Sequence, residues 1–284
     1  MEPQFECDVC QSMAYEPFLS NCKDIYSGFH GSFNYVRCVK CGLIQLHPAP
    51  KNLDAFYENY DVHRKKGMAH EWMRRLLMAH AYFPCHDDLT GKRLLDFGCG
   101  DGWFLDRARQ SGAICSGFEI NPAHAAALSA INHLPIYSSW KEMEQAGPFD
   151  VISLHFVLEH MNNTPTLIRK LGSLLAPGGE LYAIVPSISS WEFKLFGKYW
   201  HGLDPPRHLV FLNRDHVKSI AAEANLSMEK SRDVWIPTSL AGTLASLIGL
   251  RFSSKLFVLM IPVSLLFFFV QPKGNWSFHL RKQK

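Results

Sequence analysis

From residue 92 onward, short apolar runs alternate with longer segments in which apolar residues recur at helical spacing. The runs are almost continuously apolar, which is typical of strands buried on both faces. They predict a strand that ends at Asp96 and further strands over Ala113–Ile120, Ile136–Tyr137, Phe149–Leu154 and Glu180–Val185. Repeated strand–helix units predict an α/β fold, with a Rossmann-like parallel sheet covered by helices on both faces.

The segments between these strands carry helix start and stop signals. Asn121-Pro122 supplies an N-cap and a first-turn proline for a helix through Ile131. Thr164-Pro165 predicts the start of a second helix, which runs to Leu175. Pro177-Gly178-Gly179 predicts the turn into the next strand.

The C-terminal part is predicted to complete a seven-stranded sheet. Leu226–Trp235 reads as a sixth strand, and Trp276–Leu280 reads as a seventh that runs antiparallel to its neighbours. Between them lies a hydrophobic helical insertion, residues 236–272. Its stretch Leu256–Val270 has 15 residues without a charge, contains a proline and is too short for a spanning helix, which needs about 20 apolar residues.

For this insertion we predict two helices that pack on the sheet edge and contact a membrane interface through residues 239–270. After Asp233 the chain has six basic residues and no acidic one, and Arg251, Lys255 and Lys273 are expected to face anionic headgroups. Burial of the insertion against a partner subunit is the alternative, and the sequence does not determine an oligomeric state.

The N-terminal third is predicted to form two smaller units in front of the sheet. A Pro48-Ala49-Pro50 breaker separates residues 1–50 from a helical connector, residues 51–90. In the connector, Leu53–Tyr60 and His70–Phe83 look helical, and Trp72 belongs to the face expected to pack on a core. Residues 91–284 then form the third and largest unit.

Composition and charge indicate which partners and which cellular compartment to expect. The chain has 284 residues with a formal net charge of +3, and residues 1–50 carry five acids against three bases, a balance that would repel a phosphate backbone. We therefore expect no nucleic-acid partner. The first ten residues contain no apolar run typical of a signal peptide, and eight cysteines without an export signal indicate a reducing compartment, so we expect a cytoplasmic protein that is peripheral to the inner face of a membrane.

Two cysteine pairs near the N-terminus have metal-ligand spacing. Cys7-x-x-Cys10 and Cys38-x-x-Cys41 can each turn both sulfur atoms toward one point. Four thiolates suit a closed tetrahedral zinc site, which stabilises a small module and leaves no open position for catalysis. The pattern predicts a zinc ribbon over residues 1–50, with Cys22 outside the site.

The strongest chemical signal is the glycine turn Leu94–Leu105, which reads LLDFGCGDGWFL. A strand, a tight turn and a helix start are predicted there, with Gly98, Gly100 and Gly102 at alternate positions. This G-x-G-x-G spacing differs from the G-x-G-x-x-G of dinucleotide-binding folds. Glu119 follows Gly98 by 21 residues, close to the offset of about 20 at which a carboxylate at the next strand end meets a ribose diol.

In these motifs the chain resembles the class I S-adenosylmethionine (SAM) dependent methyltransferases. The matching segments are LDFGCGDG at 95–102, the acid Glu119, FDVISLHFVLEHM at 149–161 and LLAPGGELYAIVP at 174–186. The resemblance implies SAM as cofactor, bound by Asp96, Gly98, Cys99, Gly100, Gly102 and Glu119. The ribbon and the segment WHGLDPPRHLVFL at 200–212 look like a subgroup of sugar and small-metabolite methyltransferases.

Methyl transfer to a hydroxyl requires in-line positioning and removal of a proton, so the histidines near the predicted site are candidate bases. His155, at the carboxyl end of a strand, is the first choice and His208 the second, although either could simply make a structural hydrogen bond. Arg207 is predicted to pair with a phosphate or carboxylate of the acceptor. The alternative for Arg207 is an internal ion pair with Asp204.

A catalytic metal is not predicted. Glu159-His160 resembles the end of the E-x-x-E-H metal-binding pattern of ubiquinone-pathway O-methyltransferases, but Phe156 occupies the first acidic position. We therefore predict a SAM-dependent methyltransferase that acts at oxygen on a sugar, a polysaccharide precursor or a lipid-linked small metabolite. The other classes considered are a NAD-type oxidoreductase and a non-catalytic zinc-ribbon adaptor on a methyltransferase fold.

Overall fold

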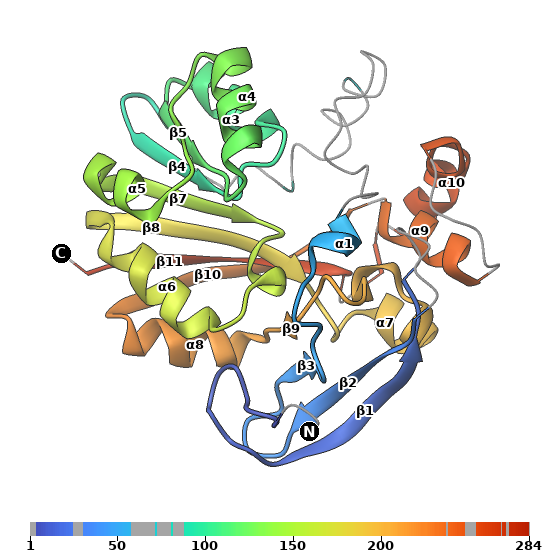
Figure 1. The fold of residues 1–284 in the computed structure, drawn as a ribbon. Coiled ribbons are helices and arrows are strands. Elements are labelled where there is room, and N and C mark those ends of the chain that lie inside the picture. Colours follow the sequence, from blue (N-terminus) through green and yellow to red (C-terminus); the bar gives the residue numbers. More distant parts are fainter. Residues whose placement is uncertain are drawn as a thin grey trace.

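A seven-stranded mixed sheet forms the centre of the molecule, in the order β10-β11-β8-β7-β4-β5-β6 (Figure 1). The computed structural model describes residues 4–24, 31–57, 72, 81, 88–236, 238–247, 254–267, 269–270 and 273–283. The strands of this sheet are β4 (Arg93–Phe97), β5 (Ile114–Phe118), β6 (Ile136–Tyr137), β7 (Phe149–His155), β8 (Leu175–Pro186), β10 (Leu226–Val234) and β11 (Asn275–Lys282).

Strand direction agrees with the sequence prediction. Strands β4 to β8 pair in parallel, whereas β11 is antiparallel to both β8 and β10. The predicted α/β sheet with an antiparallel closing strand is therefore confirmed. Two boundaries were wrong here: α6 ends at Ser173 instead of Leu175, and β8 begins at Leu175 instead of Glu180. Leu175 already pairs with Phe149 of β7, and the register then shifts before Glu180 pairs with Val151. The Pro177-Gly178-Gly179 segment lies within this irregular part of the strand.

Helices cover both faces of the sheet. Helices α3 (Trp103–Gln110) and α4 (Pro122–Asn132) lie on one face, and α6 (Thr164–Ser173) and α8 (Arg214–Glu223) on the other (Figure 1). The predicted N-cap Asn121 is confirmed, since its side chain accepts from the backbone N–H groups of Ala123 and His124. The cap of α6 is Asn163 rather than the predicted Thr164.

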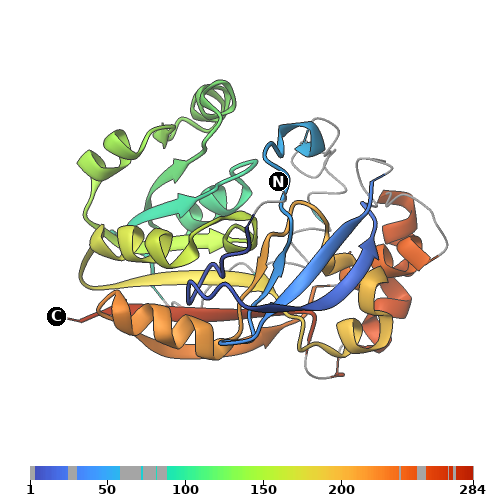
Figure 2. The same ribbon diagram turned by 60° about the horizontal axis from the view of Figure 1, so that its bottom comes forward.

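The N-terminal ribbon forms a second sheet together with a strand from the main part of the chain. Its order is β1-β2-β3-β9, with β1 (Tyr15–Cys22), β2 (Phe33–Cys38), β3 (Ile44–Leu46) and β9 (Val210–Phe211). Residue Ile44 pairs with Phe211. Figure 2 shows the long β1–β2 hairpin running beside α7 (Trp191–Phe196), where Phe18 and Phe193 stack at 5.9 Å. The ribbon therefore shares a sheet and a hydrophobic core with the rest of the chain.

The hydrophobic insertion contains two helices, α9 (Thr238–Leu247) and α10 (Ser254–Leu266). They contact each other, and α9 packs on two short 3-10 turns, η3 (Gly197–Tyr199) and η4 (His201–Leu203), at the carboxyl end of the parallel strands. Packing of the insertion on the sheet edge stays a prediction. In the described part of the chain, no helix has the length and apolar character needed to cross a bilayer.

The connector is described only in part. Helix α1 (Asp54–Tyr57) lies within the predicted helix Leu53–Tyr60, whose last three residues are outside the described ranges. Of the predicted helix His70–Phe83, only Trp72 and Ala81 are described, and both are helical. Ala81 is buried, but the side chain of Trp72 is exposed. The prediction that Trp72 lies on the face packed against a core was therefore wrong.

Candidate functional site

The glycine turn between β4 and α3 has the backbone conformation that its sequence predicts. Gly98, Gly100 and Gly102 have positive φ angles of 75°, 55° and 75°. A Cβ atom on Gly98 would lie 2.7 Å from Cγ2 of Val157, and one on Gly102 would lie 2.7 Å from Nδ2 of Asn132. These two positions therefore require glycine for conformation and for space.

Hydrogen bonds hold this turn against the next strand. The backbone N–H groups of Gly98 and Cys99 donate to Phe118 O, at 2.9 and 3.1 Å. His124 Nε2 donates to Gly100 O at 3.0 Å, so the first turn of α4 also supports the loop. The turn is thus a rigid surface of backbone at the carboxyl ends of β4 and β5, where ligands of parallel sheets bind.

Asp96 is the last residue but one of β4, just before the turn, and it is buried. Its Oδ1 accepts a hydrogen bond from Ser153 Oγ at 2.7 Å and lies 3.2 Å from His155 Nδ1. The ring of His155 packs on Phe104 and Tyr182, with centroid distances of 4.3 and 5.5 Å. The structure therefore brings the predicted base and Asp96 together, and the imidazole fixes the carboxylate in place.

Glu119 lies at the end of β5, one strand away from Asp96. Its backbone N–H donates to Tyr137 O at 2.9 Å, and its Oε1 accepts from the backbone N–H of Asn121 at 3.0 Å. These bonds fix the carboxylate at the strand end, half-exposed. Such a carboxylate can accept hydrogen bonds from two neighbouring hydroxyls, as a ribose presents.

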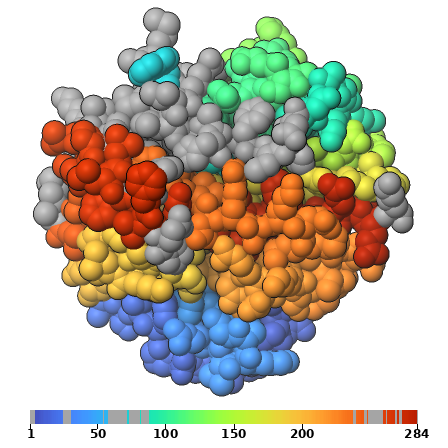
Figure 3. Space-filling view, turned by 180° about the vertical axis from the view of Figure 1, so that it is seen from behind, coloured from blue at the N-terminus to red at the C-terminus, as the bar shows by residue number. Residues whose placement is uncertain are grey.

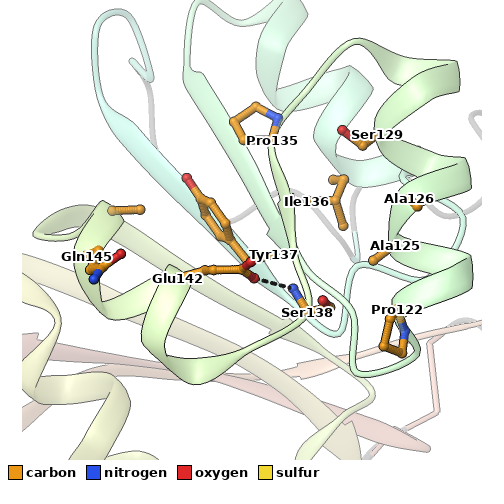
Figure 4. A pocket seen from close by; sticks show the side chains of 11 residues that line it. Pro122, Ala125, Ala126, Ser129, Pro135, Ile136, Tyr137, Ser138, Glu142 and Gln145 are labelled. Atoms are coloured by element: carbon orange, nitrogen blue, oxygen red, sulfur yellow. Dashed lines mark hydrogen bonds between the residues drawn. The ribbon is translucent and has the colours of Figure 1, made fainter.

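A separate open cavity of about 570 Å³ lies beside the edge strand β6, between α4 and α5 (Trp140–Ala146). Figure 4 shows Tyr137, Ser138 and Glu142 on one side and residues of α4 on the other. Glu142 accepts from the backbone N–H of Ser138 at 3.3 Å and caps α5, so its polar group is engaged in local structure. The cavity is mostly a groove between the two helices and does not include the glycine turn.

The four cysteines of the predicted ribbon converge. Sulfur atoms of Cys7 and Cys41 lie 3.5 Å apart, as do those of Cys10 and Cys38, and all four lie within 4.8 Å of one another. A tetrahedral zinc ion with Zn–S bonds of about 2.3 Å places its sulfur ligands about 3.8 Å apart. The separations fit this geometry, and they are too long for disulfide bonds.

Without a metal, the surroundings of the cluster favour the thiolate form at Cys38, whereas burial favours the thiol form at Cys7 and Cys41. Burial by itself raises the pKa of Cys38, but hydrogen bonds from the backbone N–H groups of Cys41 and Lys40 and from neighbouring thiols lower that pKa to about 7. Burial raises the pKa of Cys41 to about 11. A bound cation would lower the pKa of the other thiols in the cluster, because it binds the thiolate form and thereby stabilises it.

The ribbon contacts the main sheet's helices through residues next to its cysteines. The carboxylate of Asp8, inside the first C-x-x-C pair, accepts from the backbone N–H and the hydroxyl of Thr164 at the start of α6. His216 of α8 donates from Nε2 to Cys41 O at 2.9 Å. The position of the cysteine cluster is therefore coupled to α6 and α8.

Arg207 is fully buried between two carboxylates. Its guanidinium donates to Asp204, and also to both oxygens of Asp24 at 3.1 and 2.8 Å and to Phe56 O at 3.0 Å. Burial lowers the pKa of this guanidinium, but the charges of Asp204 and Asp24 outweigh it and raise the pKa. The geometry matches the internal ion pair considered as the alternative, and it turns the guanidinium away from a solvent-borne acceptor.

His208 lies in another buried group, with Glu159 and His160 of the 3-10 turn η2 (Leu158–His160). The rings of His160 and His208 are 4.6 Å apart, and His208 Nε2 lies 3.9 Å from Glu159 Oε1. Burial lowers the pKa of His208 to about 3 and raises that of Glu159 to about 8. At neutral pH the imidazole of His208 is therefore uncharged and a poor general base.

Sequence reasoning missed several residues that the site uses. Ser153 and His124 support the cofactor-side loop, and Asp24 pairs with Arg207 across 183 residues of chain. Asn121-Pro122 predicts a helix start, and His124 lies in the first turn of that helix, so the sequence contains a local signal for its contact with the glycine turn. The sequence contains no such signal for Asp24, because its partner Arg207 lies 183 residues away.

Comparisons with known proteins agree with this site. Residues 63–231, more than half of the chain, match a family model described as a methyltransferase domain. A ubiquinone biosynthesis O-methyltransferase of Pseudomonas aeruginosa is 26% identical over 146 residues, which cover 44% of this chain and 62% of that protein. One from Nitrosococcus oceani is 33% identical over 109 residues, covering 36% and 46%. The chain thus spans less than two thirds of the length of these curated relatives.

A solved structure shows the same fold. It is a chain of the complex between the Haloferax volcanii Trm112 methyltransferase activator and a methyltransferase, with a TM-score of 0.53 at 12% identity. The alignment covers 76% of this chain and 95% of that one. Because the family model covers more than half of the chain, the chain belongs to the methyltransferase-domain family.

Proposed function

We propose that the protein transfers the methyl group of SAM to an oxygen atom of a small acceptor that is a sugar, a polysaccharide precursor or a lipid-linked metabolite. The named O-methyltransferase relatives support transfer to oxygen. The observation that carries the cofactor site is the shared position of the glycine turn, Asp96 and Glu119 at one end of the sheet. When bound there, SAM supplies an activated methyl on a sulfonium sulfur.

The protein's own residues would bind and orient the two reactants. Glu119 would accept hydrogen bonds from the ribose hydroxyls, and the glycine turn would lie against the cofactor with Cys99 in its backbone wall. Asp96, held by Ser153 and His155, would orient the amino-acid end. We propose positioning roles for His155, which acts through Asp96, and for Arg207, which holds the segment before β9.

The acceptor side of the proposed site has an apolar neighbour. Helix α9 packs on η3 and η4, and Gly242 approaches the ring of His201 so closely that a Cβ atom there would lie 2.0 Å from Nδ1. Beyond it, α10 and the residues that follow expose large apolar side chains, among them Leu259, Leu266 and Phe269 at 69%, 79% and 85% exposure. An apolar surface beside the acceptor side supports the lipid-linked class over a free sugar.

The cofactor assignment predicts a specific loss of SAM binding. Saturating SAM should raise the melting temperature of the wild type, whereas Glu119→Ala should weaken SAM binding at least about tenfold, because each lost charge-assisted hydrogen bond contributes about 1.5 to 3 kcal/mol. Titration calorimetry and thermal shift measure both effects. The exposed Glu144→Ala is the matched control and should bind SAM as the wild type does.

Two other outcomes would each support one of the alternative functions. Stabilisation by NADH and not by SAM would reject the methyltransferase site in favour of a dinucleotide site. SAM binding without label transfer from methyl-labelled SAM into the lipid, polysaccharide or small-molecule fraction of a cell extract would favour the non-catalytic adaptor.

We further propose that the C-terminal helices contact a membrane interface. Figure 3 shows them on one surface of the molecule beside α7, where Trp191 stacks on Phe267 at 5.0 Å. Lys273 is described, whereas Arg251 and the side chain of Lys255 lie outside the described residues. An apolar surface with cationic neighbours in sequence is the composition expected of an interfacial helix.

Vesicle binding tests this surface. The wild type should sediment with anionic liposomes, and the double substitution Leu266→Ser and Phe269→Ser should reduce binding at least about tenfold, since burying each such side chain contributes about 1.5 to 3 kcal/mol. Ile131→Ser, at an exposed apolar position of α4, should leave binding unchanged. Equal recovery of wild type and double variant in the soluble fraction would reject the membrane contact, and a concentration-dependent dimer lost in the double variant would identify a partner subunit instead.

A further inference from the structure

Three metal-ligating side chains that the cofactor site does not use meet at the carboxyl end of the sheet. Glu159 and His160 come from η2, which begins three residues after His155, and His208 comes from the segment before β9. One donor atom from each residue lies within 4.8 Å of the others. The group therefore combines two imidazoles and a carboxylate from segments almost 50 residues apart.

Both imidazoles are oriented by backbone carbonyls. His208 Nδ1 lies 2.9 Å from Gly202 O, and His160 Nδ1 lies 3.0 Å from Arg207 O. A carbonyl oxygen only accepts hydrogen bonds, so each Nδ1 carries the proton and each Nε2 has a lone pair. Histidines that bind metal are held in this way, with the second ring nitrogen donating to a carbonyl or carboxylate.

The carboxylate of Glu159 has no hydrogen-bond partner among the described residues. Glu159 is 1% exposed, and both side-chain oxygens are buried and unpaired. Its own backbone is fixed, because Leu209 N donates to Glu159 O at 2.6 Å. Burial without a hydrogen-bond partner disfavours the ionised carboxylate, so this side chain holds a proton unless a cation binds within reach and takes its place.

The other charged groups nearby do not neutralise it. Asp204 Oδ2 lies 3.8 Å from His208 Nε2 and adds negative charge. The guanidinium of Arg207 is bonded to Asp24 and Asp204. The environment of Glu159 and the two imidazole lone pairs is therefore electron-rich, which favours a cation.

We propose that Glu159, His160 and His208 bind one divalent transition-metal ion, of the class that prefers nitrogen and oxygen ligands, such as Zn²⁺, Fe²⁺, Mn²⁺ or Co²⁺. Two imidazoles and one carboxylate are a common donor set for these ions. Bonds of about 2.0 to 2.2 Å require the three donors to move closer on binding. Three protein ligands leave coordination positions open, which distinguishes this site from the closed four-cysteine cluster.

Cobalt binding tests the proposal without reference to activity. Purified full-length protein is equilibrated with excess Co²⁺, and bound metal per chain is measured by equilibrium dialysis and elemental analysis. The wild type should bind one more equivalent of Co²⁺ than Glu159→Gln or His208→Gln. This extra ion should show weak visible d–d absorption without the near-ultraviolet charge-transfer band of a thiolate ligand.

Glu192→Gln is the matched control. Glu192 is also a buried glutamate, but Trp200 Nε1 and Ser239 Oγ donate to it, so its loss should not change the number of ions bound. Circular dichroism verifies that each variant is folded. Equal Co²⁺ binding by the wild type and both ligand variants would overturn the proposal. So would a wild type whose bound Co²⁺ shows only thiolate-type spectra, a result that does not depend on any variant folding.

Discussion

Replacing Arg207 by methionine is expected to lower the free energy of unfolding by about 3 to 5 kcal/mol. The substitution keeps much of the side-chain volume but removes the guanidinium that bonds Asp24, Asp204 and Phe56 O. Both carboxylates are buried, so each would lose its cationic partner in a site where a charge is poorly solvated. Chemical denaturation should show a lower midpoint, and thermal unfolding a melting temperature lower by roughly 10 °C.

An exposed arginine provides the control. Arg214 pairs with Asp233 at 2.7 Å, but its side chain is 43% exposed. Arg214→Met should therefore change the free energy of unfolding by no more than about 1 kcal/mol. Adding Asp24→Asn and Asp204→Asn to Arg207→Met should recover part of the loss, because the unpaired charges disappear. A loss for Arg207→Met no larger than that for Arg214→Met would contradict the buried network.

The fold was largely predictable because its signals are local. A buried strand and the helix that follows it are encoded within about 30 residues, and Asn121-Pro122 marks a helix start by its own chemistry. The glycine turn is equally local, since conformation and close approach at Gly98 restrict that residue directly. The irregular part of β8 escaped prediction because a shift of register depends on the neighbouring strand β7.

Contacts between distant segments could not be predicted from the sequence. Nothing in residues 1–50 indicates that β9 would complete the ribbon sheet, or that Asp24 would pair with Arg207. The same limit explains the metal-ligand group: the sequence showed Glu159-His160 with Phe156 at the missing position, whereas His208 approaches from another segment. Buried charged residues pair with whichever opposite charge the fold brings near them, and the distance between the two residues in the sequence does not predict this pairing.

The segment from Asp204 to Phe211 links the ribbon to the 3-10 turn η2. Arg207 bonds Asp24 of the ribbon, His208 faces Glu159, and Phe211 pairs with Ile44 of β3. Displacement of the ribbon would therefore reach the residues next to η2 through continuous covalent and hydrogen-bonded contacts. The ribbon is accordingly better described as a support of the methyltransferase domain than as an appended module.

Removing metal from the four-cysteine cluster is expected to destabilise this support strongly. In isolated zinc-binding modules the metal contributes about 10 to 16 kcal/mol of binding free energy, which is available only to the folded state. We expect Cys38→Ser to lose the zinc ion and to lower the melting temperature by roughly 10 °C or more. Hydrogen exchange should accelerate in β2 and β3, and also in β9, because β9 pairs with β3.

Cys22→Ser separates loss of a ligand from loss of a buried thiol. Cys22 is completely buried in the same module, and burial raises its pKa to about 11, so it is a protonated thiol outside the cluster. This variant should keep the zinc content of the wild type and leave exchange in β9 unchanged. If wild type, Cys38→Ser and Cys22→Ser contain equal zinc, the cluster does not bind it. If zinc is lost in Cys38→Ser while β9 stays protected, the ribbon folds independently of the methyltransferase domain, and the proposed support role fails.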